Sequence, residues 1–140
     1  MARTNLPLTN FLAENTTSLP DPAGTAVDQA NGMNIALASS AVPSAASADR
    51  LVLRVNNSAA AVHNVIVRAG GVVLVGNPPA FRSSLGDLTV AVTNATTRWI
   101  GPFDLSRHVQ TDGSLNIDFD AGTTGTITAF LMPKNTGNQP

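Results

Sequence analysis

The two histidines, His63 and His108, are the first residues to consider for chemistry. Neither lies at a spacing typical of metal ligands. Neither can be assigned a serine and an aspartate partner from sequence alone, because a catalytic triad is defined by its geometry. We therefore interpret both histidines as structural. The chain contains no cysteine, which excludes disulfides, zinc–thiolate sites and thiol nucleophiles.

Three polar residues at alternate positions, Asn116, Asp118 and Asp120, precede Gly122 and superficially resemble an oxygen-rich calcium loop. The residues between them are apolar, and this alternation is typical of a half-exposed strand. The solvated face of a strand is thus the favoured interpretation, with a weak cation site near Asp118 and Asp120 left open. We predict no catalytic residue, no metal ligand and no cofactor.

Trp99 is the only tryptophan in the chain. A single aromatic residue within a strand packs in a core more often than it binds, so a core position is the first interpretation. An anchor in a protein interface is the second, because tryptophan is enriched in interfaces, and a sugar-stacking platform is the third. A second candidate contact is the loop between Asn77 and Asp87, which carries Phe81 and Arg82.

The composition excludes two classes of partner. Of 140 residues, 43% are hydrophobic, only 12% are charged, and the net charge is −1. Binding to nucleic acid or to an anionic membrane requires clustered Lys and Arg, which this chain lacks. The first residues contain no apolar stretch typical of a secretory signal, and no segment reaches the roughly 20 apolar residues of a membrane span. We expect the protein to stay in the cytoplasm or to assemble there.

Short strand patterns recur along the chain from Thr25 onward. Leu51, Leu53 and Val55 alternate with polar residues, and Gly70-Gly71 and Asp112-Gly113 are typical hairpin turns. The predicted strands cover residues 34–38, 51–56, 64–69, 72–75, 88–93, 97–100, 107–110, 115–120 and 126–132. The last strand is apolar on both faces. These patterns predict an all-β fold, an antiparallel β-sandwich of about eight strands, jelly-roll or immunoglobulin-like, with a small closed barrel as the second choice.

Three regions follow from this interpretation: an extended N-terminal arm (1–24), a β-sandwich domain (25–133) and a flexible tail (134–140). The arm contains prolines and scattered apolar residues that cannot form a core of their own, so we expect it to be ordered only against a partner surface. The candidate partner-binding residues are Arg3, Leu6, Leu8, Phe11 and Leu12 in the arm, with Phe81, Arg82 and Trp99 in the domain.

Three runs in the C-terminal half carry a resemblance to a known class of proteins: residues 97–103 (TRWIGPF), 108–113 (HVQTDG) and 126–133 (TITAFLMP). They resemble small all-β structural proteins of tailed bacteriophages, particularly of actinobacterial hosts, and most of all head decoration, or cement, proteins. The resemblance implies a virion protein that binds the major capsid protein on the outer capsid surface. It also implies a homotrimer that stabilises contacts between capsomers.

Two other kinds of protein fit the same composition. A phage tail or fibre β domain would differ little from a decoration protein. A carbohydrate-binding adhesion module would need an exposed aromatic platform and an export route, and the missing secretory signal counts against it. An enzyme ranks third, because no motif for catalysis is present.

Overall fold

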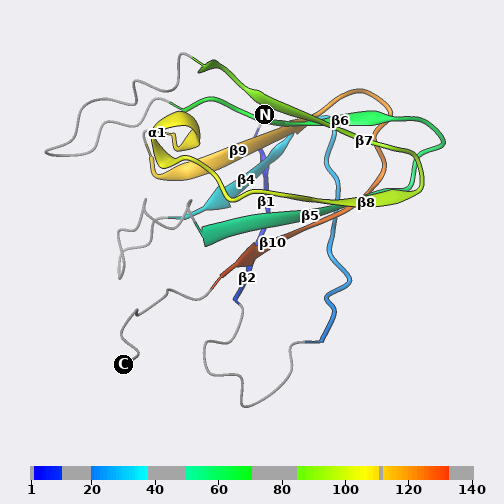
Figure 1. Cartoon of the computed structure of the whole chain (residues 1–140), viewed down its shortest axis with the longest axis horizontal. Helices are drawn as coiled ribbons and strands as arrows, with labels where there is room; N and C mark the ends of the chain where they lie inside the picture. Colours follow the sequence, from blue (N-terminus) through cyan, green and yellow to red (C-terminus); the bar gives the residue numbers. More distant parts are fainter. Residues whose placement is uncertain (1, 11–19, 38–49, 71–84, 111, 133–140) are drawn as a thin grey trace, which may run out of the picture.

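The computed structural model describes residues 2–10, 20–37, 50–70, 85–110 and 112–132. In these residues the chain forms ten strands and one short helix, α1 (Leu105–His108). The strands form two sheets that stack as the two layers of a sandwich (Figure 1). The prediction of an all-β sandwich is confirmed.

The two sheets interleave strands that are distant in the sequence. Sheet A contains, in spatial order, β1 (Thr4–Asn5), β4 (Met33–Ala36), β9 (Ser114–Phe119), β6 (His63–Val67) and β7 (Leu88–Val92). Sheet B contains β2 (Leu8–Asn10), β10 (Gly125–Leu131), β5 (Leu51–Asn57) and β8 (Thr96–Ile100), and β3 (Thr25–Ala26) also pairs with β10.

The core lies between the two sheets and follows the alternation seen in the sequence. In β5, Leu51, Leu53 and Val55 are buried, and the residues between them are more exposed. In β9 the odd-numbered residues from Leu115 to Phe119 are buried in the same way. Burying a Val, Leu, Ile, Phe or Met side chain contributes roughly 1.5–3 kcal/mol, so these inward faces are the main source of stability.

Strand β10 is buried on both faces, as its sequence predicts. Ile127 and Ala129 point into the core, and Thr128 and Phe130 on the opposite face are at most 5% exposed. The segment before β3 contributes to this cover, because Gly24 lies directly against the side chains of β10. Gly24 has a φ of 85°, a conformation that glycine adopts without strain.

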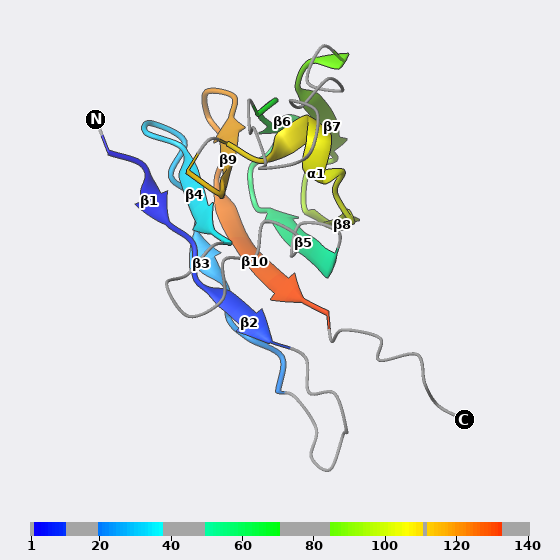
Figure 2. The same ribbon diagram turned by 90° about the vertical axis from the view of Figure 1, so that its left-hand side faces the viewer.

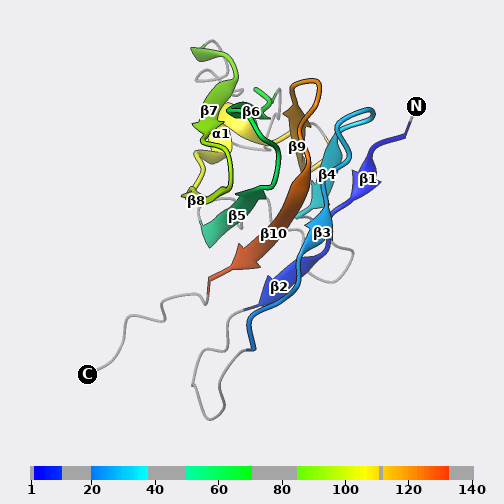
Figure 3. The ribbon, with the colours of Figure 1, turned by 90° about the vertical axis from the view of Figure 1, so that its right-hand side faces the viewer.

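The N-terminal residues differ most from the prediction. Strands β1 and β2 pair in parallel with β4 and β10, whereas every other strand pair is antiparallel in the described residues. The N-terminal segment (residues 2–10) therefore runs along one side of the sandwich, opposite β7 and β8 (Figure 2, Figure 3). Leu6, between the two strands, is 1% exposed and belongs to the core. The prediction of an arm without a place in the core is wrong for these residues.

The predicted strand at residues 107–110 is also wrong. The backbone N–H groups of Arg107 and His108 both donate to the carbonyl of Asp104, at 3.1 Å, and form one helical turn. His108 and Val109 are both buried. The hairpin predicted at Asp112-Gly113 is wrong as well, because no strand precedes it; a tight turn leads into β9 instead, with the N–H of Gly113 bonded to the carbonyl of Gln110 at 2.9 Å.

Several predicted elements lie outside the described residues. These are the strand at 72–75, the C-terminal tail at 134–140 and most of the arm beyond residue 10. Strand β4 covers Met33–Ala36, where the sequence predicts residues 34–38.

Candidate functional site

Four of the eight predicted partner-binding residues lie in the described part of the chain. Phe11, Leu12, Phe81 and Arg82 fall outside it. The four described residues are Arg3, Leu6, Leu8 and Trp99, and they have different environments.

Leu6 and Leu8 pack within the domain. The 1% exposure of Leu6 makes its side chain inaccessible to a partner in this fold, so its predicted role in binding is wrong. Leu8 is partly buried and packs against the core cluster. Both leucines are buried or partly buried because the parallel pairing of the N-terminal segment places their side chains between the sheets.

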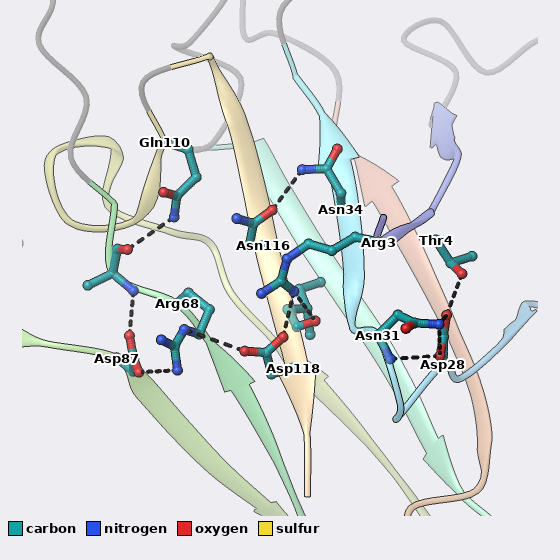
Figure 4. Close-up of polar contacts among 12 residues, drawn as sticks. Arg3, Thr4, Asp28, Asn31, Asn34, Arg68, Asp87, Gln110, Asn116 and Asp118 are labelled. Atoms are coloured by element: carbon teal, nitrogen blue, oxygen red, sulfur yellow. Dashed lines mark hydrogen bonds and ion pairs between the residues drawn. The ribbon is translucent and has the colours of Figure 1, made fainter. Parts of the chain in front are cut away.

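Arg3 belongs to a chain of alternating charges on the outer face of sheet A (Figure 4). Its guanidinium lies 2.5 Å from Asp118 Oδ1, and Asp118 Oδ2 lies 3.4 Å from Arg68 Nε. Arg68 also contacts Asp87 Oδ2 at 3.0 Å. The chain of contacts starts at Arg3, immediately before β1, and crosses β9 at Asp118. It continues to Arg68, immediately after β6, and ends at Asp87, immediately before β7. Because these side chains are partly exposed, each ion pair contributes about 1 kcal/mol or less.

The contact between Arg3 and Asp118 passes over Gly32, immediately before β4. A Cβ atom at this position would collide with Arg3 Nη1 and with Asp118 Oδ1. Gly32 also has a φ of 75°, which residues with a Cβ rarely adopt. Glycine therefore suits this position, because a residue with a Cβ would be strained at this φ and would displace the ends of the Arg3 and Asp118 side chains.

A second contact holds the N-terminal segment beside the first. The Thr4 hydroxyl donates to Asp28 Oδ2 at 2.6 Å, and the Asn31 N–H donates to Asp28 Oδ1 at 3.0 Å. These hydrogen bonds, that of Thr4 above all, lower the pKa of the Asp28 carboxyl below its usual value. The carboxylate therefore stays ionised and keeps both contacts at neutral pH.

Asparagine side chains from three neighbouring strands form a row on the same face. Asn5, Asn34 and Asn116 are paired in register across β1, β4 and β9, and Asn34 Nδ2 donates to Asn116 Oδ1 at 2.7 Å. They border a polar groove together with Arg3, Ser114 and Asp112. The row extends the hydrogen bonding of sheet A from the backbone to the side chains.

Both histidines have structural partners. His63 Nδ1 lies 3.1 Å from Asp120 Oδ1, and Asp120 also accepts the N–H of Asn64 at 3.0 Å. Burial raises the pKa of Asp120, but the hydrogen bonds from Asn64, Thr123 and His63 together outweigh it and lower the pKa overall. These contacts join the start of β6 to the end of β9.

His108 is 2% exposed, and its Nδ1 lies 3.2 Å from the carbonyl oxygen of Arg68. Its ring also contacts Phe103 edge-on at 5.7 Å. Burial lowers the pKa of His108, so the ring is neutral at neutral pH and donates its Nδ1–H to the carbonyl.

The acidic residues considered for a cation site are used in other contacts. Asp118 contacts two arginines, and Asp120 holds His63 and a backbone N–H. Within the ranges that the structure describes, no group of three or more His, Asp or Glu side chains is arranged to hold a metal ion.

Among the four predicted residues that the structure describes, Trp99 is the one that is largely exposed, at 58%. The first interpretation, a core position, is therefore wrong. The indole stacks on Phe130, with ring centroids 5.4 Å apart and an interplanar angle of 27°. Phe130 is 2% exposed, so it supports the indole from the protein side. We call Trp99, Phe130 and Arg54 the Trp99 cluster.

Arg54 joins the two rings of the Trp99 cluster. Its guanidinium carbon lies 5.9 Å from the centroid of Trp99 and 5.5 Å from that of Phe130. Arg54 forms an ion pair with Asp21 and donates to the carbonyl of Pro22 at 2.7 Å. These contacts fix the guanidinium and neutralise its charge.

A polar groove continues from the Trp99 cluster on the outer face of sheet B. Asp21, Arg54, Asn56, Thr97 and Thr126 contribute to its lining. Asn56 Nδ2 donates to Thr97 Oγ1 at 3.0 Å. Trp99 and Thr97 are two residues apart in β8 and share this face, so the exposed indole and the groove form one surface.

Sequence reasoning did not find Arg54, Phe130 or Asp21 as neighbours of Trp99. Alternation assigns Arg54 to the outer face of its strand, but the pairing of Arg54 with Trp99 depends on the order β10-β5-β8. In that order Arg54 pairs with Trp99, 45 residues away, and with Thr128, 74 residues away, and local patterns do not encode such separations.

Comparison with known proteins gives no relative from which a function could be transferred. No family model matches the chain, and neither curated proteins nor solved structures give a significant match. Within the described residues, the structure contains no helix long and apolar enough to cross a membrane.

Proposed function

We propose that this protein is a non-catalytic structural protein of a tailed phage particle, a decoration protein that binds the outer surface of the capsid. Its partners are the major capsid protein and further copies of itself, arranged as a homotrimer. The proposal is supported by the resemblance of residues 97–103, 108–113 and 126–133 and by the all-β fold. Two of these runs cover most of β8 and β10, which supply Trp99 and Phe130 to one face of sheet B.

The observation that carries the proposal is the path of the N-terminal segment. It adds β1 to the edge of sheet A and β2 to the edge of sheet B, and it inserts Leu6 between the sheets. The N–H groups of Thr4 and Leu6 donate to the carbonyls of Gly32 and Asn34, at 3.0 and 2.9 Å. One continuous segment thus fastens both layers of the sandwich.

A protein that braces neighbouring capsomers has to remain one rigid body when they move apart. Separation of the two sheets would break the strand pairing of this segment on at least one sheet and expose Leu6 to water. The charge chain on sheet A adds contacts across its strands. Such a domain suits a mechanical role.

The experiment compares phage particles with and without the protein. Binding only to the assembled capsid stabilises the assembled state, so adding the purified protein to particles that lack it should raise the temperature of DNA release. Equal temperatures would contradict the cement role. Gold-labelled protein found on tails, with heads unlabelled, would favour the tail or fibre alternative.

A further inference from the structure

We propose that the outer face of sheet B, at the Trp99 cluster and the adjoining polar groove, is a binding site for a neutral saccharide. The proposal does not depend on the capsid role, because it rests on the chemistry of this face alone.

The indole of Trp99 has the geometry of a stacking platform. The indole stacks on Phe130 with Arg54 beside it, and Trp99 is nevertheless 58% exposed, so ring surface remains accessible to a ligand. An aromatic ring carries negative charge density on its face. The C–H groups on one side of a pyranose ring carry partial positive charge, so they pack favourably on such a surface.

The supporting residues keep the platform in place before a ligand arrives. Phe130 is buried, and Arg54 is held against both rings by Asp21 and by the carbonyl of Pro22. Little side-chain freedom is lost on binding, which reduces the entropic cost of association.

The groove beside the platform supplies hydrogen-bonding groups of the kinds that sugar hydroxyls use. Asn56 has two amide N–H donors and an acceptor oxygen, and its contact with Thr97 uses only one of the donors. The Asp21 side chain is 83% exposed, so its carboxylate is accessible from solvent. Hydroxyls of Thr97 and Thr126 lie along the same groove.

The charges on this face favour an uncharged ligand. The guanidinium of Arg54 is neutralised by Asp21. Stacking of nucleic-acid bases would require a positively charged groove along the backbone, which this face does not provide. A protein hot spot would place Trp99 among groups that exclude water, whereas the neighbouring side chains Asn56 and Thr97 are polar and exposed.

The single tryptophan allows a site-specific test, because the chain has no other tryptophan and no tyrosine. The full-length protein is titrated with cellohexaose, xylohexaose, chitohexaose and dextran while tryptophan emission is recorded. We expect a saturable change in emission with at least one probe. Asn56→Ala, which keeps the tryptophan, should weaken binding by about tenfold, the effect of about 1.4 kcal/mol.

The matched control is Asn5→Ala, which removes another exposed strand asparagine on the outer face of sheet A. It should leave the affinity unchanged. Trp99→Ala, measured by calorimetry, should abolish binding, and Trp99→Phe should retain part of it because a ring remains. Circular dichroism melting confirms that each variant is folded.

Two outcomes overturn the proposal: no probe changes the emission up to about 10 mM, well above a dissociation constant of 1 mM, or the Asn5 and Asn56 variants weaken binding equally. If Trp99→Ala abolishes capsid binding and no saccharide binds, Trp99 is a protein anchor, and the capsid role stands without the saccharide site. Saccharide binding by a protein that does not change DNA release would contradict the capsid role alone.

Discussion

Replacing Leu6 by alanine tests whether the N-terminal segment is part of the core. The matched change is Leu85→Ala, which makes the same chemical deletion at a side chain that is 57% exposed. Leu6 is 1% exposed, so its deletion should leave a cavity between the sheets. The two variants differ in burial and not in the atoms removed.

The expected magnitude follows from the burial of each side chain. Buried Leu→Ala changes cost about 2–5 kcal/mol, and we expect about 3 kcal/mol at Leu6. Leu85→Ala should cost less than about 0.5 kcal/mol, as surface changes usually do. With an unfolding entropy of about 2.1 cal/mol/K per residue, a chain of 140 residues loses about 10 °C in Tm for 3 kcal/mol.

Urea unfolding followed by far-ultraviolet circular dichroism measures both variants. The midpoint should fall for Leu6→Ala with an unchanged slope, because the surface exposed on unfolding stays nearly the same. Leu6→Met, which conserves volume, should cost less than about 1.5 kcal/mol. If Leu6→Ala and Leu85→Ala unfold at the same urea concentration, the N-terminal segment does not belong to the core.

Three further predictions concern the polar contacts. Gly32→Ala should destabilise the protein by about 1–3 kcal/mol, through strain at positive φ and collision with the Arg3–Asp118 pair. Urea unfolding measures this loss and that of Arg3→Ala. A loss in Gly32→Ala no larger than that in Arg3→Ala would contradict the strain and collision at Gly32. Burial lowers the pKa of His108 from 6.5, so its contribution to stability is full above pH 6.5 and declines as pH falls below it. The urea midpoint should therefore drop between about pH 7 and about pH 5, and His108→Gln should reduce that drop. If the wild-type protein and His108→Gln show the same drop, protonation of His108 is not its cause. Calcium should leave the Tm unchanged, because Asp118 and Asp120 already have partners; a Tm that rises with calcium and returns with chelator would indicate a cation site.

Local patterns predicted the parts of the fold in which one strand face meets the core. Alternation in β5 and β9 assigns each residue to the buried or exposed face, since the side-chain period of a strand is two residues. The apolar character of both faces of β10 similarly indicated a strand covered from both sides. In each case the signal lies within one strand.

The N-terminal segment shows where such patterns stop. Strands β1 and β2 have two and three residues, too few for a period to be visible. Their partners, β4 and β10, lie far along the chain, and the pairing is parallel. Prolines and scattered leucines suggested an arm, yet Pro7 lies in the bend between the two strands, where no strand hydrogen bond is required.

Predicting the Trp99 cluster likewise requires knowing which strands pair across long stretches of sequence. From the sequence alone, a lone tryptophan in a strand is compatible with a core position, an interface anchor and a sugar platform alike. The place of β8 in the sheet decides against a core position. In the described residues β8 is an edge strand of sheet B, and four of its five residues are exposed. At an edge the indole cannot be covered by a further strand, so it lies back across β5 onto Phe130 and keeps one face in solvent. The sequence shows that Trp99 is present, but its environment depends on the pairing of β8 with β5, which the sequence pattern does not reveal.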